Sequence, residues 1–178
     1  LLTAAVGGEI TLTEDVVLEQ GLNVTADMTI NLNGHNITIA AAYNDANVTA
    51  SSAISNNAIM TLTGNGEIKA ENNYTVRNYG TMIIDGVTVK NGIMNFGELT
   101  VESGNISNDR SGKHAIYGYA AKLTINGGTF HNGNPGNAGI FADGGEVVIN
   151  GGEFNAPVYC ENCTVTGGVT VNNTYVKQ

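Results

Sequence analysis

The segments IYGYAAKLTINGGTF (residues 116–130) and IFADGGEVVINGGEF (residues 140–154) share one pattern of apolar and polar residues. Each opens with an aliphatic residue, runs through a short polar stretch into an aliphatic-x-aliphatic triplet, and then reaches glycine. Five further copies, the last of them weaker, begin at Ile54, Val76, Ile93, Val158 and Val24. A motif that recurs about every 20 residues is the signature of a stacked solenoid.

Within each copy, apolar and polar residues alternate, which is typical of a β-strand with one buried side. The expected inward pairs are Met60 and Leu62, Met82 and Ile84, Leu99 and Val101, Leu123 and Ile125, Val147 and Ile149, and Cys163 and Val165. A strand of about three to five residues cannot bury its apolar side alone, whereas copies stacked about 4.8 Å apart build a continuous core.

The chain is therefore expected to be all-β, a single-stranded right-handed parallel β-helix (a solenoid) of about eight coils with an N-terminal cap. Crossover chirality favours the right-handed form. A tandem β-propeller is the alternative architecture, but it needs roughly 40 residues and four strands per blade.

Glycine follows the triplet in most copies, where a tight corner needs a positive φ or a close approach of backbones. The predicted corner glycines are Gly34, Gly64, Gly86, Gly127, Gly151 and Gly167. Another apolar residue recurs three positions later and is expected to open the next inward face, at Ile37, Val89, Ile106, Phe130 and Phe154.

The length of 178 residues indicates one domain, with a cap and first strand in residues 1–21 and repeat coils in residues 22–178. Hydrophobic residues make up 42% and charged residues only 13%, so the chain can bury a core. A net charge of −9 argues against nucleic acid as a partner. No apolar run approaches about 18 residues, so no membrane insertion is expected.

The two ends of the predicted stack differ. Residues 1–6, followed by Gly7 and Gly8, predict the last turn of a helix that covers the first coil. The alternating stretch GEITLTEDVVL (residues 8–18) is expected to open the stack. No capping pattern follows at the C-terminus, so we expect more chain, a symmetry mate or a partner subunit to cover the last coil.

Cys160 and Cys163 form a C-x-x-C pair, which indicates redox or metal chemistry only in a fitting context. Cys163 occupies the inward position that Leu123 and Val147 hold in other copies. We interpret both cysteines as small core or corner residues, with a local disulfide and a metal site as alternatives. A zinc site needs a second pair of ligands, so we expect no metal and no cofactor.

Three insertions follow the inward residue beyond the glycine corner, in residues 40–52, 107–115 and 131–139. All three leave the solenoid at the same corner and are expected to stack into one lateral surface, as binding loops of repeat proteins do. The alternative is that they are solvated loops without a ligand. The candidate ligand-binding residues are Tyr43, Asn44, Asp45, Asp109, Arg110, His114, Tyr117, His131, Asn132 and Asn134.

The alignment of copies also predicts columns of charge. Glu98, Lys122 and Glu146 fall at one outward position in successive coils, where opposite charges attract. Asp85 and Glu102 share another column on adjacent coils. Two carboxylates at that spacing are either a retaining glycosidase pair or an exposed like-charge pair.

The units LTINGGTF and VVINGGEF resemble the pectin-lyase-like family of right-handed parallel β-helices. The stretch GGEITLTEDVVLEQGLNVTADMTINLNGHNI (residues 7–37) resembles the opening coils of β-helical phage fibre or decoration proteins and of bacterial surface proteins. The resemblance implies the fold over almost the whole chain. It implies no single activity, because this scaffold hosts lyases, hydrolases, adhesins and virion parts.

The enzymatic members of that family carry motifs that this chain lacks. It has no N-T-D motif, D-D pair, G-H-G or R-x-K, which polygalacturonases carry. Its two arginines, Arg77 and Arg110, have no acidic cluster that resembles the calcium ligands of pectate lyases. We therefore expect that the chain is not an enzyme.

Three functions remain as expectations. The first is a non-enzymatic structural component of an extracellular assembly, on a virion or a cell surface, that associates with itself or with other structural subunits. The alternative is an adhesin module that binds a surface glycan or a receptor through the loops stacked at one corner. A polysaccharide lyase or glycoside hydrolase is the least favoured reading.

Overall fold

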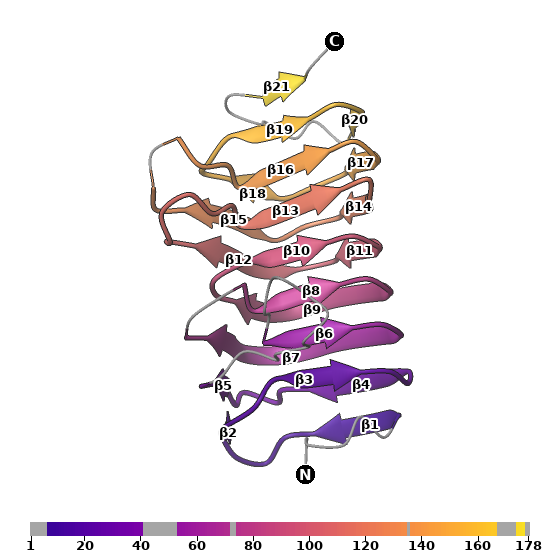
Figure 1. Ribbon diagram of the computed structural model, residues 1–178, viewed down its shortest axis with the longest axis vertical. Coiled ribbons are helices and arrows are strands. Elements are labelled where there is room, and N and C mark those ends of the chain that lie inside the picture. The colour runs from indigo at the N-terminus through magenta and orange to yellow at the C-terminus, as the bar shows by residue number, and fades with distance from the viewer. Residues whose placement is uncertain (1–6, 41–52, 72–73, 135, 167–173, 177–178) are drawn as a thin grey trace.

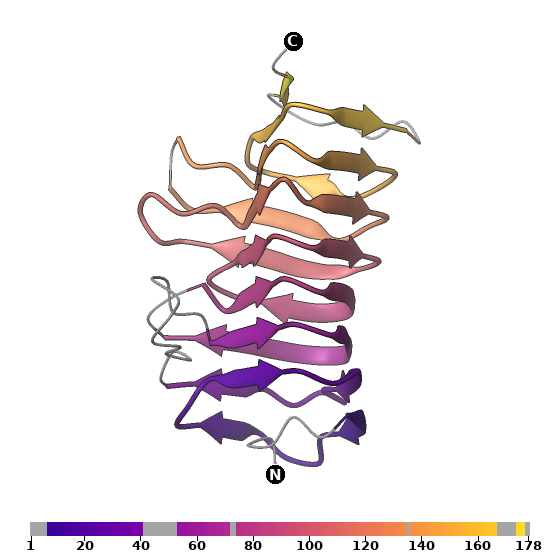
Figure 2. The same ribbon diagram turned by 45° about the vertical axis from the view of Figure 1, so that its right-hand side comes forward.

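The computed structural model describes residues 7–40, 53–71, 74–134, 136–166 and 174–176. Over these residues the chain is all-β, contains no helix, and winds as a parallel β-helix (Figures 1 and 2). Every strand pairing is parallel and joins one coil to the next. The predicted fold class is therefore confirmed. The predicted capping helix in residues 1–6 lies outside the described residues.

Two sheets run along the stack (Figure 1). The smaller, eight-stranded sheet contains β3 (Leu22–Val24), β6 (Ile54–Asn56), β8 (Val76–Asn78), β10 (Ile93–Asn95), β13 (Ile116–Tyr119), β16 (Ile140–Asp143), β19 (Val158–Cys160) and β21 (Thr174–Val176).

The larger sheet has a main path and a side branch. The path runs through β1 (Gly8–Thr11), β4 (Met28–Asn31), β7 (Ile59–Ala70), β9 (Thr81–Val89), β11 (Glu98–Val101), β14 (Lys122–Ile125), β17 (Glu146–Ile149) and β20 (Cys163–Val165). The branch holds β2 (Val16–Leu18), β5 (Ile37–Ile39), β12 (Gly104–Asn108), β15 (Thr129–Asn132) and β18 (Glu153–Phe154).

The register of the sheets follows the repeat. Leu99 pairs with Leu123, Leu123 with Val147, and Val147 with Cys163. All the predicted inward residues from Met60 to Ile149 are at most 2% exposed, and the five apolar residues beyond the corners are buried as well. The last predicted pair is the exception, with Cys163 partly buried and Val165 42% exposed, because β20 ends its path and no described strand packs beyond it.

Two strands are longer than the expected three to five residues. β7 has 12 residues and β9 has 9, because each continues through the corner that separates two strands in other coils. In β7 this continuation needs a shift of register between Thr63 and Gly66, a bulge that bends the strand without ending it.

The predicted glycines from Gly34 to Gly151 do lie at corners, the earlier ones with a positive φ and Gly127 and Gly151 at a close approach of backbones. Positive φ values occur at Gly34, Gly64 and Gly86, but in later coils they occur at Gly128 and Gly152, one residue beyond the predicted Gly127 and Gly151. At Gly151 a Cβ would lie 2.2 Å from the carbonyl oxygen of Asn126 in the previous coil. In each double glycine, therefore, the first residue permits the close approach of two coils, and the second adopts the positive φ of the turn. Gly167 lies outside the described residues.

The cysteines do lie in the core and at a corner, but they form the local disulfide that was only the alternative interpretation. Cys160 and Cys163 form a disulfide, with Cα atoms 5.8 Å apart. Cys160 ends β19 and Cys163 begins β20, so the bond joins the two sheets across one corner. Cys163 does hold the predicted register opposite Val147, and the C-x-x-C spacing places both sulfurs on the same turn.

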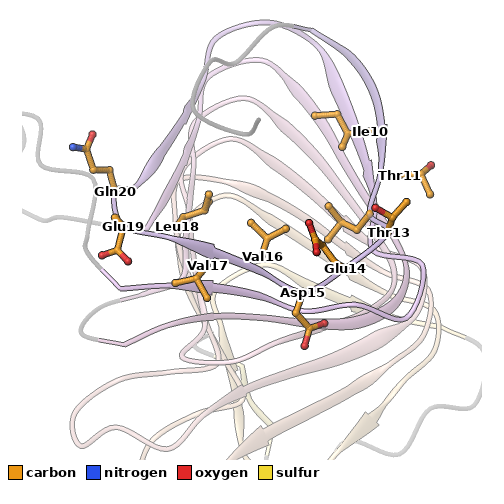
Figure 3. A pocket seen from close by; sticks show the side chains of 11 residues that line it. Ile10, Thr11, Thr13, Glu14, Asp15, Val16, Val17, Leu18, Glu19 and Gln20 are labelled. Atoms are coloured by element: carbon orange, nitrogen blue, oxygen red, sulfur yellow. The ribbon is translucent and has the colours of Figure 1, made fainter.

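Among the described residues, no strand packs beyond the first coil at the N-terminal end of the core. Ile10, Val16 and Leu18 point into the ring of this coil, whereas Asp15 and Val17 point away (Figure 3). Together with neighbouring residues they line a hollow of about 760 Å³. The strands β1 and β2 pair with β4 and β5, so residues 8–18 do open the stack as expected.

A buried column of asparagines, which the sequence analysis did not identify, follows the strands of the eight-stranded sheet. The Nδ2 of Asn56 donates to the Oδ1 of Asn78, and the Nδ2 of Asn78 donates to the Oδ1 of Asn95, both at 2.8 Å. Each amide also donates to a carbonyl at the start of a neighbouring strand, in Thr81, Glu98 and Lys122. All three side chains are at most 1% exposed. The column satisfies polar backbone groups at a buried corner.

We expect Ile125→Asp to unfold several coils together. Ile125 is fully buried between Val101 and Ile149, and an unpaired buried carboxylate costs about 4 kcal/mol or more. Hydrogen exchange should show lost protection in the neighbouring coils as well as in β14. The control is Thr124→Asp, an outward position on the same strand. Loss confined to one coil would contradict the continuous core.

We expect Asn78→Ala to destabilise the chain by about 3 kcal/mol, since it removes three hydrogen bonds, one of which is the bond that a buried amide N–H of Asn56 donates. Urea unfolding with an unchanged slope is the measurement. The matched control is Asn126→Ala, in an exposed ladder, which should cost less than about 1 kcal/mol. Equal losses in the two variants would show that the buried column has no special role.

Candidate functional site

The second and third insertions stack on each other, as predicted, at the edge where β12 and β15 end (Figure 2). The backbone N–H of Ala138 donates to the Nδ1 of His114 at 2.9 Å, and the Nδ2 of Asn132 donates to the carbonyl of Lys113 at 2.7 Å. The Nδ2 of Asn134 donates to the carbonyl of Asp109. These bonds make one lateral surface, which we call the corner surface, from residues 109–115, 131–134 and 136–139.

The candidate residues on the corner surface have different environments. Asp109 and His131 are partly exposed, and the Nε2 of His131 lies 3.6 Å from a carboxylate oxygen of Asp109. Asn132 is only 8% exposed, and its amide holds the two loops together. The backbone N–H of Arg110 donates to Asn108. Tyr43, Asn44 and Asp45, in the first insertion, lie outside the described residues.

His114 connects the corner surface to the eight-stranded sheet. Its ring stacks on Phe141, with centroids 4.8 Å apart, and near Tyr117 at 6.2 Å. Its backbone N–H donates to the hydroxyl of Tyr74. Burial holds the pKa of the His114 imidazole below its usual 6.5, and the Lys113 ammonium lowers it further. The imidazole is therefore neutral near pH 7, with Nδ1 as acceptor and Nε2 carrying the proton.

The outer side of the eight-stranded sheet gathers aromatic side chains that the sequence analysis largely missed. Tyr117 in β13 pairs with Phe141 in β16, and Phe141 pairs with Tyr159 in β19. A second column lies two residues further along the copies, with Tyr119 at the end of β13 and with Tyr79 and Phe96 immediately after β8 and β10. We call these six side chains the aromatic face. The signal in the sequence was the second residue of three copies, in IY, IF and VY, and the fourth residue of three copies, in VRNY, IMNF and IYGY.

Arg77 lies at the lower end of the aromatic face. Although it occupies an outward position of β8, it is only 6% exposed. Its guanidinium carbon lies 5.9 Å and 5.5 Å from the ring centres of Tyr79 and Phe96, within the range of cation–π attraction. The Nη1 donates to the hydroxyl of Tyr79 at 3.2 Å, and the buried Nε has no hydrogen-bond acceptor.

The two carboxylates considered for catalysis do share a column, since Ile84 pairs with Val101 immediately before them. Both are exposed, and each accepts a hydrogen bond from the coil above. Asp85 accepts from the Ser103 hydroxyl at 2.7 Å, and Glu102 accepts from the Asn126 amide at 2.9 Å. Glu102 belongs to a surface ladder that continues through Asn126 to Asn150 and Thr166.

The predicted charge column is confirmed. Glu98 pairs with Lys122, which pairs with Glu146. The Nζ of Lys122 donates to the carboxylate of Glu98 at 2.7 Å, and this contact raises the pKa of the lysine. The pair is exposed, so its contribution to stability is small.

The titration of His114 predicts a pH dependence of stability. The unfolded chain binds this proton near pH 6.5, whereas the folded chain binds it only at lower pH, so stability falls as pH drops below 6.5. We expect His114→Asn, which retains an acceptor for Ala138, to reduce this slope in unfolding measured between pH 7 and 5. The control His131→Gln should retain it. An unchanged slope in His114→Asn would contradict the assignment.

Among the described residues, no group of three or more His, Cys, Asp or Glu side chains is arranged to hold a metal ion. No helix that could cross a membrane occurs in that part of the chain. No protein-family model matches the sequence, and no curated protein and no solved structure resembles the chain significantly.

Proposed function

We propose that this chain is a non-catalytic structural module of an extracellular assembly, on a virion or a cell surface. The observation that carries the proposal is the unbroken path of parallel strands from β1 to β20 over one continuous core. In such a stack each coil is held by both neighbours, which makes the module a stiff rod.

The arrangement of polar side chains supports the same proposal. Asp85 and Glu102 accept hydrogen bonds within a ladder that ties successive coils together. The buried column uses the side-chain amides of Asn56, Asn78 and Asn95 in hydrogen bonds to one another. These side chains add hydrogen bonds between coils, and both carboxylates are exposed to solvent and not enclosed in an apolar pocket.

The disulfide between Cys160 and Cys163 supports an extracellular location. Disulfides persist in oxidising environments and are rare in reducing ones. The proposed partners are further copies of the chain or other structural subunits of the same assembly.

Binding of a surface glycan or a receptor through the corner surface is the second candidate function. It is favoured by the hydrogen bonds that fix the two described loops against each other, because a preorganised surface binds at lower entropic cost. Asp109 and His131 offer partly exposed polar groups there, and the ring of Tyr117 stacks near that of His114.

The structural proposal predicts that the full-length protein associates at high concentration. Sedimentation equilibrium or light scattering over a wide concentration range measures this. A purely monomeric full-length protein, which also fails to bind other subunits of its assembly, would contradict the proposal.

A glycan array with parallel detection of cleavage products tests the second candidate. Binding that is lost on combined alanine substitution of Asp109, His131 and Asn134, without loss of folding, would establish the corner surface as a receptor site. Release of cleavage products would contradict the non-catalytic proposal, and Asp85 and Glu102 would then be the candidate catalytic carboxylates.

A further inference from the structure

We propose that the contact between His114 and Ala138 is an acid-sensitive switch in the corner surface. In mildly acidic solution, protonation of the imidazole breaks this contact and opens one side of the corner surface, while the solenoid stays folded. This goes beyond the proposed function, because it concerns contacts within the chain and holds whether or not the corner surface binds a partner. The pH dependence of unfolding predicted above concerns the whole fold, whereas this opening is local.

The contact joins the second insertion to the third. The Nδ1 of His114 accepts a hydrogen bond from the backbone N–H of Ala138 at 2.9 Å. A neutral imidazole accepts at one of its nitrogens, whereas an imidazolium carries a proton on both and only donates. Protonation therefore turns the acceptor into a second donor that faces the N–H of Ala138.

Burial converts the loss of this hydrogen bond into movement. Ala138 is fully buried and His114 is partly buried. Two buried donors that face each other both need new acceptors, because a buried polar group without a partner is strongly unfavourable. Water reaches the two N–H groups only when the chain at Ala138 and the imidazole separate.

His114 is held on its other sides, so Ala138 is the part that moves. The imidazole stacks on the ring of Phe141, with centroids 4.8 Å apart and planes 14° apart. The backbone N–H of His114 donates to the hydroxyl of Tyr74, and its carbonyl accepts from the Nδ2 of Asn108. Because aromatic ring faces attract cations, the imidazolium stays on Phe141 after protonation.

The groups around His114 do not compensate the positive charge. Burial and, to a smaller extent, the Lys113 ammonium hold the pKa of the imidazole below 6.5. Burial raises the pKa of the Tyr74 hydroxyl, which therefore stays neutral in acid. Among the described residues, no ion pair includes His114. The neighbours that face it are Lys113 from the second insertion, Tyr74 from the segment before β8, Tyr117 from β13, the uncharged Phe141 from β16 and the uncharged Ala138 from the third insertion.

A second histidine limits the opening to one side of the corner surface. The Nε2 of His131 in β15 lies 3.6 Å from a carboxylate oxygen of Asp109 in the second insertion. The protonated form of His131 is attracted to this carboxylate, so acid does not weaken the contact. The Nδ2 of Asn134 also donates to the carbonyl of Asp109, a bond that no titrating group makes. The corner surface therefore changes shape in acid and does not unfold as a whole.

Amide exchange measured by NMR on the full-length protein, between about pH 7.5 and 4.5, tests the switch. The protection factor of the Ala138 N–H, which corrects for intrinsic exchange, should fall at least about tenfold as His114 titrates in the same samples. The reference amide is that of Ile93, which donates to the carbonyl of Ala115 at 2.8 Å. Its protection should change less than about twofold.

His114→Asn is the conservative variant, because its side-chain oxygen can accept the Ala138 N–H and does not titrate in this range. Protection of Ala138 in this variant should vary less than about twofold over the same range of pH. His131→Gln is the matched control, since it removes the other histidine of the corner surface, and it should keep the fall seen in the wild type.

Four results would overturn the proposal. Protection of Ala138 could stay unchanged while His114 titrates, or the imidazole could still be neutral at about pH 4.5. Ile93 could lose protection together with Ala138, which would mean that the solenoid unfolds as a whole. The fall could also persist in His114→Asn, which would assign the acid response to another group. None of these results bears on the structural role, which is tested by association.

Discussion

The structure depends on the in-register parallel pairing of each coil with the next. At a spacing of about 4.8 Å, this pairing places every side chain directly over its equivalent in the neighbouring copy. A side chain must therefore tolerate the residue at the same position one coil away. Aliphatic residues meet this condition by packing, as Leu99, Leu123 and Val147 do. Asparagine meets it because its amide is both donor and acceptor, and Glu98 meets it by alternating with Lys122.

The sequence predicted the elements that this condition controls and missed those that depend on the conformation of single turns. The aliphatic triplet, the inward residues and the charge column followed from alignment of the copies alone. The choice between Gly151 and Gly152 as the turning residue did not, because it depends on how closely Asn126 of the previous coil approaches. The pairing of Cys160 with Cys163 likewise depended on the distance across one corner.

The candidate site was predicted in outline. The shared exit corner of the insertions followed from their positions in the repeat, and two of them do form one surface. The roles of individual side chains did not follow, because burial separates Asn132, which joins the loops, from the exposed Asp109 and His131. The residues of the aromatic face recur at outward positions of the repeat. The alternation of apolar and polar residues predicts only which side chains are buried, so it did not single out Tyr119 or Phe141.

The asparagine column ends at Asn95, because Gly118 occupies the same register position in the next coil. Ala142 and Cys160 occupy this position in the two coils after that. The stack thus contains two blocks with different corner chemistry, joined between β10 and β13. Duplication or loss of one whole coil inside a block would preserve every contact at the corner. The length of such a rod therefore changes in steps of about 4.8 Å, one for each coil. A lineage could lengthen or shorten it by unequal recombination without redesigning the core.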